Sequence, residues 1–218
     1  MSPATTDVVF SGSCTALVTP FDGGQLDKNA FCKLVEWQIE SGTDALIPVG
    51  TTGESPTLSH EEHDIVVELC IKQAAGRVPV IAGAGSNSTA EAVRLARHAS
   101  EAGADAVLIV SPYYNEPTQD GLYQHFSAVA AAVSLPVIVY DIPGRSIVQV
   151  AEDTLARLST DYPNISGIKD ATADVARPTR IRNLLGADFA QLSGEENSDE
   201  ISQKKTKMKF ASNNAGGI

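Results

Sequence analysis

The sequence predicts an α/β protein built on a parallel sheet, and a (β/α)8 barrel is the fold that fits it best. Short apolar runs rich in Val, Ile and Leu recur at intervals of about 30 residues, the length of one strand–helix unit. These runs show no polar alternation, as expected of parallel strands that are buried on both faces. Amphipathic stretches with recognisable helix starts lie between them. Together these observations favour repeated βα units with right-handed crossovers.

Seven of the apolar runs are predicted to form strands. They are Ser13–Val18, Ala45–Val49, Val78–Ala82, Ala106–Val110, Val137–Tyr140, Ile165–Lys169 and Phe189–Leu192. Their β-branched and aliphatic composition is typical of buried strands. No glycine-rich GxGxxG sequence follows the first run, so a doubly wound open sheet ranks second to the barrel.

The helices between these strands are predicted from their start signals and apolar stripes. Asp27 precedes the first stripe, and Ser59–Glu62 and Ser88–Glu91 both have the pattern of a capping box. A fourth stripe comprises Leu122, Phe126, Val129 and Val133. The segment Asp174–Leu185 is a weaker candidate, because Pro178 is tolerated only in a first helical turn.

The pattern changes after Gly194, where the chain becomes polar and rich in lysine. Met208–Ser212 is the only candidate for an eighth strand, and it is a poor one. A barrel of this kind takes about 250 residues. We therefore expect one barrel domain over residues 1–194 and a divergent polar tail over residues 195–218.

Composition argues against several classes of partner. The 218-residue chain carries a net charge of −11, which disfavours binding to nucleic acid or to an anionic membrane surface. No apolar run approaches the length of a membrane span, and residues 1–7 lack the features of a signal peptide. Cys14, Cys32 and Cys70 have neither metal-ligand spacing nor even pairing, so we expect free thiols in a reducing compartment, the cytoplasm by default.

Lys169 is the leading candidate for a catalytic residue, because it ends the apolar strand Ile165–Lys169. An amine at such a position is largely desolvated, which favours its neutral form and lets it attack a carbonyl to form a Schiff base. Gly167 in the same strand lets a backbone or a ligand approach closely. The ordinary alternative is a lysine that extends to solvent from the end of the strand.

Polar residues follow other predicted strands at the same edge. Thr51 and Thr52 lie between glycines, in a loop whose hydroxyl and N–H groups can hold a small carboxylate. Tyr140 is a candidate general acid or base, and Arg145 is a candidate clamp for a carboxylate. Gly194 follows the seventh strand and permits close approach of a ligand. Capping threonines and a surface arginine on a turn are the structural alternatives.

These candidates converge, because the carboxyl ends of barrel strands meet on one face. A neutral lysine, a phenol, a carboxylate cradle and an arginine fit an aldolase-type reaction of a 2-oxo acid. The amine forms an imine, the imine becomes an enamine, and the enamine attacks an aldehyde. No cluster of His, Asp and Glu with metal-ligand spacing lies at these strand ends, so metal-assisted aldol chemistry ranks lower and no metal site is expected. The covalent imine with the substrate would need no cofactor.

Five motifs, in this order, resemble the dihydrodipicolinate synthase and N-acetylneuraminate lyase family: Ala16–Phe21, Gly50–Ser55, Ser111–Asn115, Tyr140–Arg145 and Gly167–Asp170. The resemblance runs from Phe10 to Gly194. It implies a (β/α)8 barrel that condenses pyruvate with aspartate semialdehyde in lysine and diaminopimelate biosynthesis, without a cofactor. Arg145, which in this family binds the carboxylate of the aldehyde, favours the synthases over the sugar-acid lyases, which generally lack it.

The resemblance also implies roles for individual residues. Lys169 forms the imine with pyruvate, and Tyr140 relays the proton. Thr51 and Thr52 hold the pyruvate carboxylate, and the Thr52 hydroxyl links Tyr140 to Tyr114. In the family, the residue that matches Tyr114 reaches across a dimer interface into the neighbouring site.

A regulatory site and an assembly are implied as well. Family members that lysine inhibits bind it at a dimer-interface cleft, and the matching positions here are Ser55, His60, His63, Asn87, Glu91 and Tyr113. We therefore expect lysine feedback on a homo-oligomer, a dimer of dimers. The alternative is that Glu91 serves a capping box and that His60 and His63 are surface residues of a first helical turn.

Three departures from the family pattern leave other functions open. Asp141 stands where the family usually has Asn, and a carboxylate there would disfavour the phenolate of Tyr140 if it pointed inward. Pro56 replaces a small residue beside the regulatory cleft. From Ser198 onward the resemblance ends, and the family's last strand and C-terminal helices are missing or replaced. The alternatives are a related 2-oxo-acid aldolase that takes another aldehyde, and a non-catalytic family member.

Overall fold

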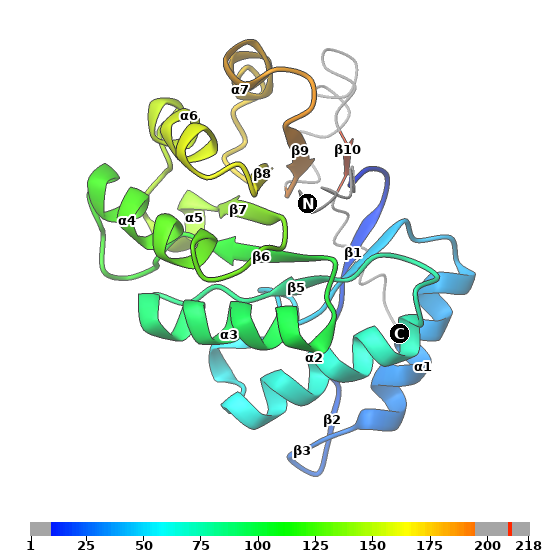
Figure 1. Cartoon of the computed structure of the whole chain (residues 1–218). Helices are drawn as coiled ribbons and strands as arrows, with labels where there is room; N and C mark the ends of the chain where they lie inside the picture. The colour runs from blue at the N-terminus through cyan, green and yellow to red at the C-terminus, as the bar shows by residue number, and fades with distance from the viewer. Residues whose placement is uncertain (1–9, 195–208, 211–218) are drawn as a thin grey trace, which may run out of the picture.

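The structure of the protein is a computed structural model, which describes residues 10–194 and 209–210. Its strands run side by side in chain order, and helices cover the outside of the curved row (Figure 1). The parallel strands are β1 (Cys14–Ala16), β4 (Ala45–Ile47), β5 (Ile81–Gly83), β6 (Ala106–Val110), β7 (Val137–Asp141), β8 (Ile165–Asp170), β9 (Ala190–Ser193) and β10 (Lys209–Phe210). A short antiparallel hairpin, β2 (Phe21–Asp22) and β3 (Gln25–Leu26), lies outside this row.

Backbone pairing confirms the predicted α/β architecture of a (β/α)8 barrel. Strands β5 to β10 form one six-stranded parallel sheet, and β1 pairs with β4. A single parallel bridge between Leu46 and Val80 joins the two groups. Within the described residues, no pairing is seen between β1 and β10.

All seven predicted strands are present, and the eighth candidate is confirmed at Lys209–Phe210. This segment pairs in parallel with β9, with Lys209 opposite Leu192 and Phe210 opposite Ser193. The rest of the Met208–Ser212 candidate and most of the predicted tail lie outside the described residues. The register places β10 where the last strand of a barrel follows the seventh.

The helices are α1 (Lys28–Glu40), α2 (His60–Ala74), α3 (Thr89–Ala102), α4 (Gln119–Ala130), α5 (Pro143–Ser146), α6 (Glu152–Asp161) and α7 (Arg177–Leu185), with a 3-10 turn over Ser55–Thr57. Helix α4 ends before Val133, and α7 begins at Arg177 rather than Asp174, with Pro178 in its first turn as predicted. Helices α5 and α6 were not predicted. None of the helices in the described residues is long and apolar enough to cross a membrane.

Capping explains where α2 and α3 begin, and it corrects one prediction. Ser59 and Glu62 form the reciprocal capping box predicted for α2. Ser88 accepts a hydrogen bond from the Glu91 N–H, but the Glu91 carboxylate does not return to the Ser88 backbone. It accepts instead from Ser86 Oγ and pairs with His60. The second capping box was therefore only half right, because a neighbouring loop and helix compete for the Glu91 carboxylate.

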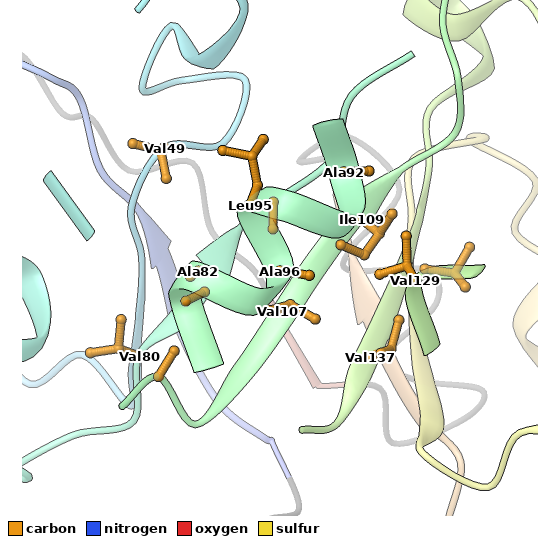
Figure 2. Close-up of a cluster of buried hydrophobic side chains, with 14 of the residues drawn as sticks. Val49, Val80, Ala82, Ala92, Leu95, Ala96, Val107, Ile109, Val129 and Val137 are labelled. Atoms are coloured by element: carbon orange, nitrogen blue, oxygen red, sulfur yellow. The ribbon is translucent and has the colours of Figure 1, made fainter. Parts of the chain in front are cut away.

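Strand residues alternate between two apolar layers. In β6, Val107 and Ile109 face the helices, whereas Ala106 and Leu108 belong to the interior cluster. Figure 2 shows the outer layer, with Leu95 and its neighbours on α3 packed over the strand valines. Burial on both faces is why the strands carry near-continuous apolar runs. A polar side chain in the interior layer therefore departs from this pattern and requires a specific structural or functional explanation.

Candidate functional site

A cavity of about 280 Å³ opens at the carboxyl ends of the strands, where polar side chains replace the apolar interior layer. It is lined by Ala16, Ile47, Gly50, Thr51, Thr52, Leu108, Tyr140, Ile142, Arg145, Lys169 and Gly194. The structure therefore brings Lys169, Tyr140, both threonines, Arg145 and Gly194 to one place, as their positions after the strands predicted. A second cavity of about 250 Å³ shares Thr51, Tyr140 and Arg145 with the first.

Lys169 lies on β8 with only 3% of its surface exposed. Burial lowers the pKa of its amine from 10.5 to about 8, and the charge of Cys14 opposes this shift only in part. The Nζ atom lies 4.6 Å from the centre of the Tyr140 ring. Since Tyr140 and Lys169 are direct partners in the β7–β8 register, the sheet itself holds the amine beside the phenol.

Two glycines make room around Lys169. A β-carbon built on Gly194 would lie 3.2 Å from Cε of Lys169 and 2.9 Å from Cβ of Ala171. A β-carbon on Gly167 would lie 2.9 Å from both Cβ and the carbonyl oxygen of Ala190 on β9. Gly167 thus admits a neighbouring strand, whereas Gly194 leaves space for the lysine side chain itself.

The loop after β4 adopts a conformation that presents the threonines to the cavity. Val49 and Glu54 both have left-handed backbone angles, with φ of 48° and 60°. For a β-branched residue such as Val49 this conformation is strained, and such strain is common beside functional sites. The Thr19 hydroxyl donates a 2.8 Å hydrogen bond to the carbonyl of Gly53, which anchors the turn. The loop is therefore fixed by the segment that follows β1 rather than by its own capping alone.

Arg145 lies on the short helix α5, is exposed, and lines both cavities. The segment around it is shaped by Ser146, whose buried hydroxyl donates to the carbonyls of Ile142 and Val148. Ile147 follows with a φ of 69°. The exposed guanidinium can meet a carboxylate at the mouth of the cavity.

Tyr114 does not reach the cavity within this chain. Its side chain is 83% exposed, its φ is 73°, and it lines neither cavity. The predicted link from Tyr140 through Thr52 to Tyr114 stays a prediction. A residue so exposed and so strained is suited to a contact outside its own chain.

The predicted regulatory residues divide into three groups. His60 and Glu91 pair, and Ser86 and His60 lower the pKa of the Glu91 carboxyl. Ser55 and Tyr113 instead line the second cavity. The backbone carbonyl of Asn87 accepts from the Asn115 side chain at 3.3 Å.

The surface position considered for His63 was wrong. It is buried rather than on the surface, and its Nε2 donates to the Gly83 carbonyl at 3.0 Å. Burial lowers the pKa of this imidazole to about 4. His63 belongs to the inner face of α2, one turn ahead of Val66 and Val67, which pack on the strands. This helical spacing was the signal that could have located it.

Asp141 is turned away from Tyr140, so the inward orientation considered for it was wrong. Neighbouring strand residues point to opposite faces, and Tyr140 occupies the interior. The Asp141 carboxylate accepts from Nη1 of Arg177 at 2.7 Å and from the Val150 N–H at 3.1 Å. Burial raises the pKa of Asp141, and Arg177 offsets this only in part. Arg177 itself was not anticipated from the sequence.

In the described residues, no three His, Cys, Asp or Glu side chains come together as a metal site would require. The polar groups at the cavity are instead an amine, a phenol, two hydroxyls and a guanidinium. Such a set can hold a small carboxylate and form an imine with a carbonyl.

Comparison with known proteins identifies the arrangement. The model of the dihydrodipicolinate synthetase family matches residues 9–212. A 4-hydroxy-tetrahydrodipicolinate synthase from Rhodopseudomonas palustris is 62% identical over 187 residues, which are 86% of this chain and 63% of the relative. The chain thus spans less than two thirds of that relative's length.

Two solved structures share the fold. The chloride-inhibited dihydrodipicolinate synthase from Acinetobacter baumannii, complexed with pyruvate, superposes with a TM-score of 0.87 and 47% identity, over 93% of this chain and 70% of that one. The enzyme from Cyanidioschyzon merolae, solved with lysine bound, gives a TM-score of 0.87 and 37% identity, over 94% and 70% of the two chains.

Proposed function

The chain belongs to the dihydrodipicolinate synthetase family, and on that premise we propose that it is a 4-hydroxy-tetrahydrodipicolinate synthase. It condenses pyruvate, held as a lysine imine, with aspartate semialdehyde in lysine and diaminopimelate biosynthesis. The observation that carries this proposal is Lys169, a buried amine with a pKa near 8 in a cavity with a phenol and two threonines. The covalent imine replaces any separate cofactor.

The proposed reaction begins when the neutral amine of Lys169 attacks the C2 carbonyl of pyruvate. A C–N bond forms, water leaves, and an imine results. The C3 methyl group then loses a proton, which gives an enamine. Its terminal carbon forms a C–C bond with the aldehyde carbon, and the aldehyde oxygen takes up a proton. Tyr140 would carry protons in these steps, a role that its ring beside the amine supports.

Thr51 and Thr52 would hold the pyruvate carboxylate, and Arg145 would hold that of the second substrate. The threonines follow β4 and line the same cavity as Lys169. Arg145 lies at the mouth, which suits a second substrate that enters after pyruvate is bound. Fixing both carboxylates orients the enamine toward the aldehyde, which is where most of the rate gain of a two-substrate reaction arises.

Borohydride trapping tests the proposal directly. The purified 218-residue chain is incubated with pyruvate and borohydride, and the modified peptide is identified by mass spectrometry. A reduced pyruvyl adduct on Lys169 is expected, and Lys169→Met should abolish it. Lys72→Met, at an exposed lysine on α2, serves as the matched control and should leave the adduct unchanged. A folded chain that yields no adduct on Lys169 would refute the proposal and favour a non-catalytic family member.

Aldehyde selectivity separates the synthase from a related 2-oxo-acid aldolase. With aspartate semialdehyde, Arg145→Ala should lower kcat/KM by about 100-fold, the loss of a charge-assisted carboxylate contact, while pyruvate trapping persists. Arg97→Ala, at an exposed arginine on α3, is the control. Equal activity of wild type on an uncharged aldehyde would favour the other aldolase.

We also propose that the protein works as a homo-oligomer, a dimer of dimers, in the cytoplasm. The exposed Tyr114 supports a subunit contact, and the three cysteines, all in the described residues, form no disulfide. Sedimentation should give a tetramer that Tyr114→Ala weakens. A monomer that is fully active would refute the assembly.

Lysine is proposed as a feedback inhibitor that binds near His60 and Glu91. The Cyanidioschyzon merolae relative was solved with lysine bound, and a carboxylate beside an imidazole suits an amino acid's charged groups. Calorimetric titration with lysine should show binding that Glu91→Gln weakens at least tenfold. Glu101→Gln, exposed on the same helix, is the control. Undiminished binding to the Glu91 variant would exclude this site.

A further inference from the structure

Among the residues that the structure describes, Arg177 is the largest side chain that is completely buried. It stands at the first position of α7 and has no exposed surface. Its Nη1 donates to Asp141 at 2.7 Å, and its Nη2 donates to the Val150 carbonyl at 2.6 Å. Nη1 also lies 3.5 Å from a carboxylate oxygen of Asp170. Burying a charge is costly, so a fully buried arginine with this many hydrogen-bond and ion-pair partners is a specific structural element of the fold.

The two carboxylates occupy matching places on neighbouring strands. Asp141 ends β7, Asp170 ends β8, and the two are direct partners in the strand register. The pair one residue earlier is Tyr140 and Lys169. Because strand residues alternate in direction, the phenol and the amine face the cavity while both carboxylates face α7. Arg177 therefore joins, from behind, the two strand ends that carry the phenol and the amine.

Arg177 also fixes the loop that carries Arg145. The Asp141 carboxylate accepts from the Val150 N–H, and Arg177 donates to the Val150 carbonyl. Both ends of the segment from Asp141 to Val150 are thus held at the ion pair of Arg177 and Asp141, the far end through the backbone of Val150. Arg145 lies between these two anchors, on α5.

We propose that Arg177 is a positioning residue that sets the relative placement of Lys169, Tyr140 and Arg145 by clamping the ends of β7 and β8 and the loop to Val150. It never touches substrate, since it lies on the outer face of the sheet. The inference rests on the proposed function, because it concerns the geometry in which Lys169 meets pyruvate.

The clamp requires arginine specifically. The guanidinium is planar and rigid, and it presents separate N–H groups to Asp141 and to Val150 at the same time. A lysine would keep the charge but supply one compact ammonium, which cannot meet both partners with fixed geometry. Arg177→Lys therefore preserves the local charge balance and removes only the cross-link.

The test measures the rate of pyruvate trapping on Lys169 as a function of pyruvate concentration. In Arg177→Lys the maximal rate should fall about tenfold or more, since small misplacements of reacting groups cost rate steeply. The half-saturating pyruvate concentration should stay within about twofold, because Thr51 and Thr52 are untouched. Arg180→Lys, an exposed arginine on the same helix, should match wild type.

A second control separates a loss of stability from a loss of positioning as the cause of slow trapping. Leu158→Ala removes a fully buried side chain of α6 and should lower the melting temperature while leaving the maximal trapping rate unchanged. If Arg177→Lys fails to fold, the double variant Arg177→Gln with Asp141→Asn removes both charges of the closest ion pair and leaves only the Asp170 carboxylate beside it, and it should fold and trap slowly. A wild-type maximal rate in either folded Arg177 variant would overturn the inference. A wild type that never traps pyruvate would instead overturn the proposed function.

Discussion

Lys169 and Arg177 are two buried cations on opposite faces of the same pair of strands, and their surroundings differ sharply. Lys169 faces the cavity, where its nearest described aromatic neighbour is the Tyr140 ring at 4.6 Å. Arg177 faces the helix layer, within 2.7 Å of the Asp141 carboxylate and 3.5 Å of that of Asp170. Both side chains are almost completely buried. Burial alone therefore does not decide what a cation does here.

The difference is explained by the nearby charges. No carboxylate of the described residues forms an ion pair with Lys169, so burial favours the neutral amine, and the pKa of Lys169 falls to about 8. With the carboxylates of Asp141, Asp170 and Glu152 within 3.9 Å and a carbonyl beside it, Arg177 acts as a structural link. Successive residues at the ends of β7 and β8 thus differ in role: Tyr140 and Lys169 face the cavity, whereas Asp141 and Asp170 face Arg177 and hold the strand ends in place.

Removal of the paired cation should have the largest effect on stability. Arg177→Met leaves the Asp141 and Asp170 carboxylates buried without a counter-charge, which should lower the free energy of unfolding by about 3–5 kcal/mol at pH 7. Urea unfolding at pH 7 measures this loss.

Acid should partly rescue that variant. Burial raises the pKa of the Asp141 carboxyl above that of the unfolded chain, and without Arg177 nothing offsets this, so the variant gains stability as the pH falls and Asp141 takes up a proton. The deficit relative to wild type should therefore shrink between pH 7 and pH 4. Arg180→Met, at an exposed ion pair, should change the stability little at either pH. An Arg177→Met variant as stable as wild type at pH 7 would contradict the contrast.

Removal of Lys169 should instead raise the free energy of unfolding. A Lys169 pKa lowered from 10.5 to about 8 corresponds to a cost of about 3 kcal/mol in the folded state below pH 8, where the amine is charged in both states. Lys169→Met should remove this cost, raising the free energy of unfolding while abolishing the adduct. As the pH rises from 8 to 10.5, wild type loses its proton first in the folded state and recovers stability, so the difference should close. A less stable Lys169→Met at pH 7 would show that the amine is favourably paired.

The rate of trapping should follow the charge of the same amine. Only the neutral form attacks a carbonyl, so at fixed pyruvate the initial rate should rise about tenfold per pH unit below the folded pKa and level off above about pH 8. Stopped incubations between pH 6 and pH 9.5 measure this profile. A rate that continues to rise to pH 9.5 would place the amine in a more solvated site than its burial implies.

The sequence predicted the reactive residues Lys169 and Tyr140 but did not predict the structural role of Arg177. Lys169 and Tyr140 were found because each ends an apolar run, and barrel topology gathers strand ends on one face. Arg177 was missed because its burial depends on carboxylates from two strands, whose pairing is known only once the sheet is assembled. Pattern alone reads an arginine at a helix start as a surface residue.

Two other misses had signals in the sequence. Strand alternation after an inward Tyr140 sends Asp141 outward, which the period of two could have predicted. His63 precedes Val66 and Val67 by three and four residues, so it continues their buried stripe on α2. By contrast, nothing in the sequence around Glu91 indicated that Ser86 and His60 would take its carboxylate from the capping box.

The smallest effect is expected from Asp141→Asn, which tests whether the link at Arg177 depends on charge or on hydrogen-bond geometry. The amide oxygen can accept from both Arg177 and Val150 as the carboxylate does, and one of two neighbouring buried negative charges is removed. The free energy of unfolding at pH 7 should therefore change by less than about 1 kcal/mol, with an unchanged trapping rate. Urea unfolding and pyruvate trapping on one preparation measure both. A loss as large as that of Arg177→Met would mean that the Asp141 charge, rather than the guanidinium geometry, holds the ends of β7 and β8 together.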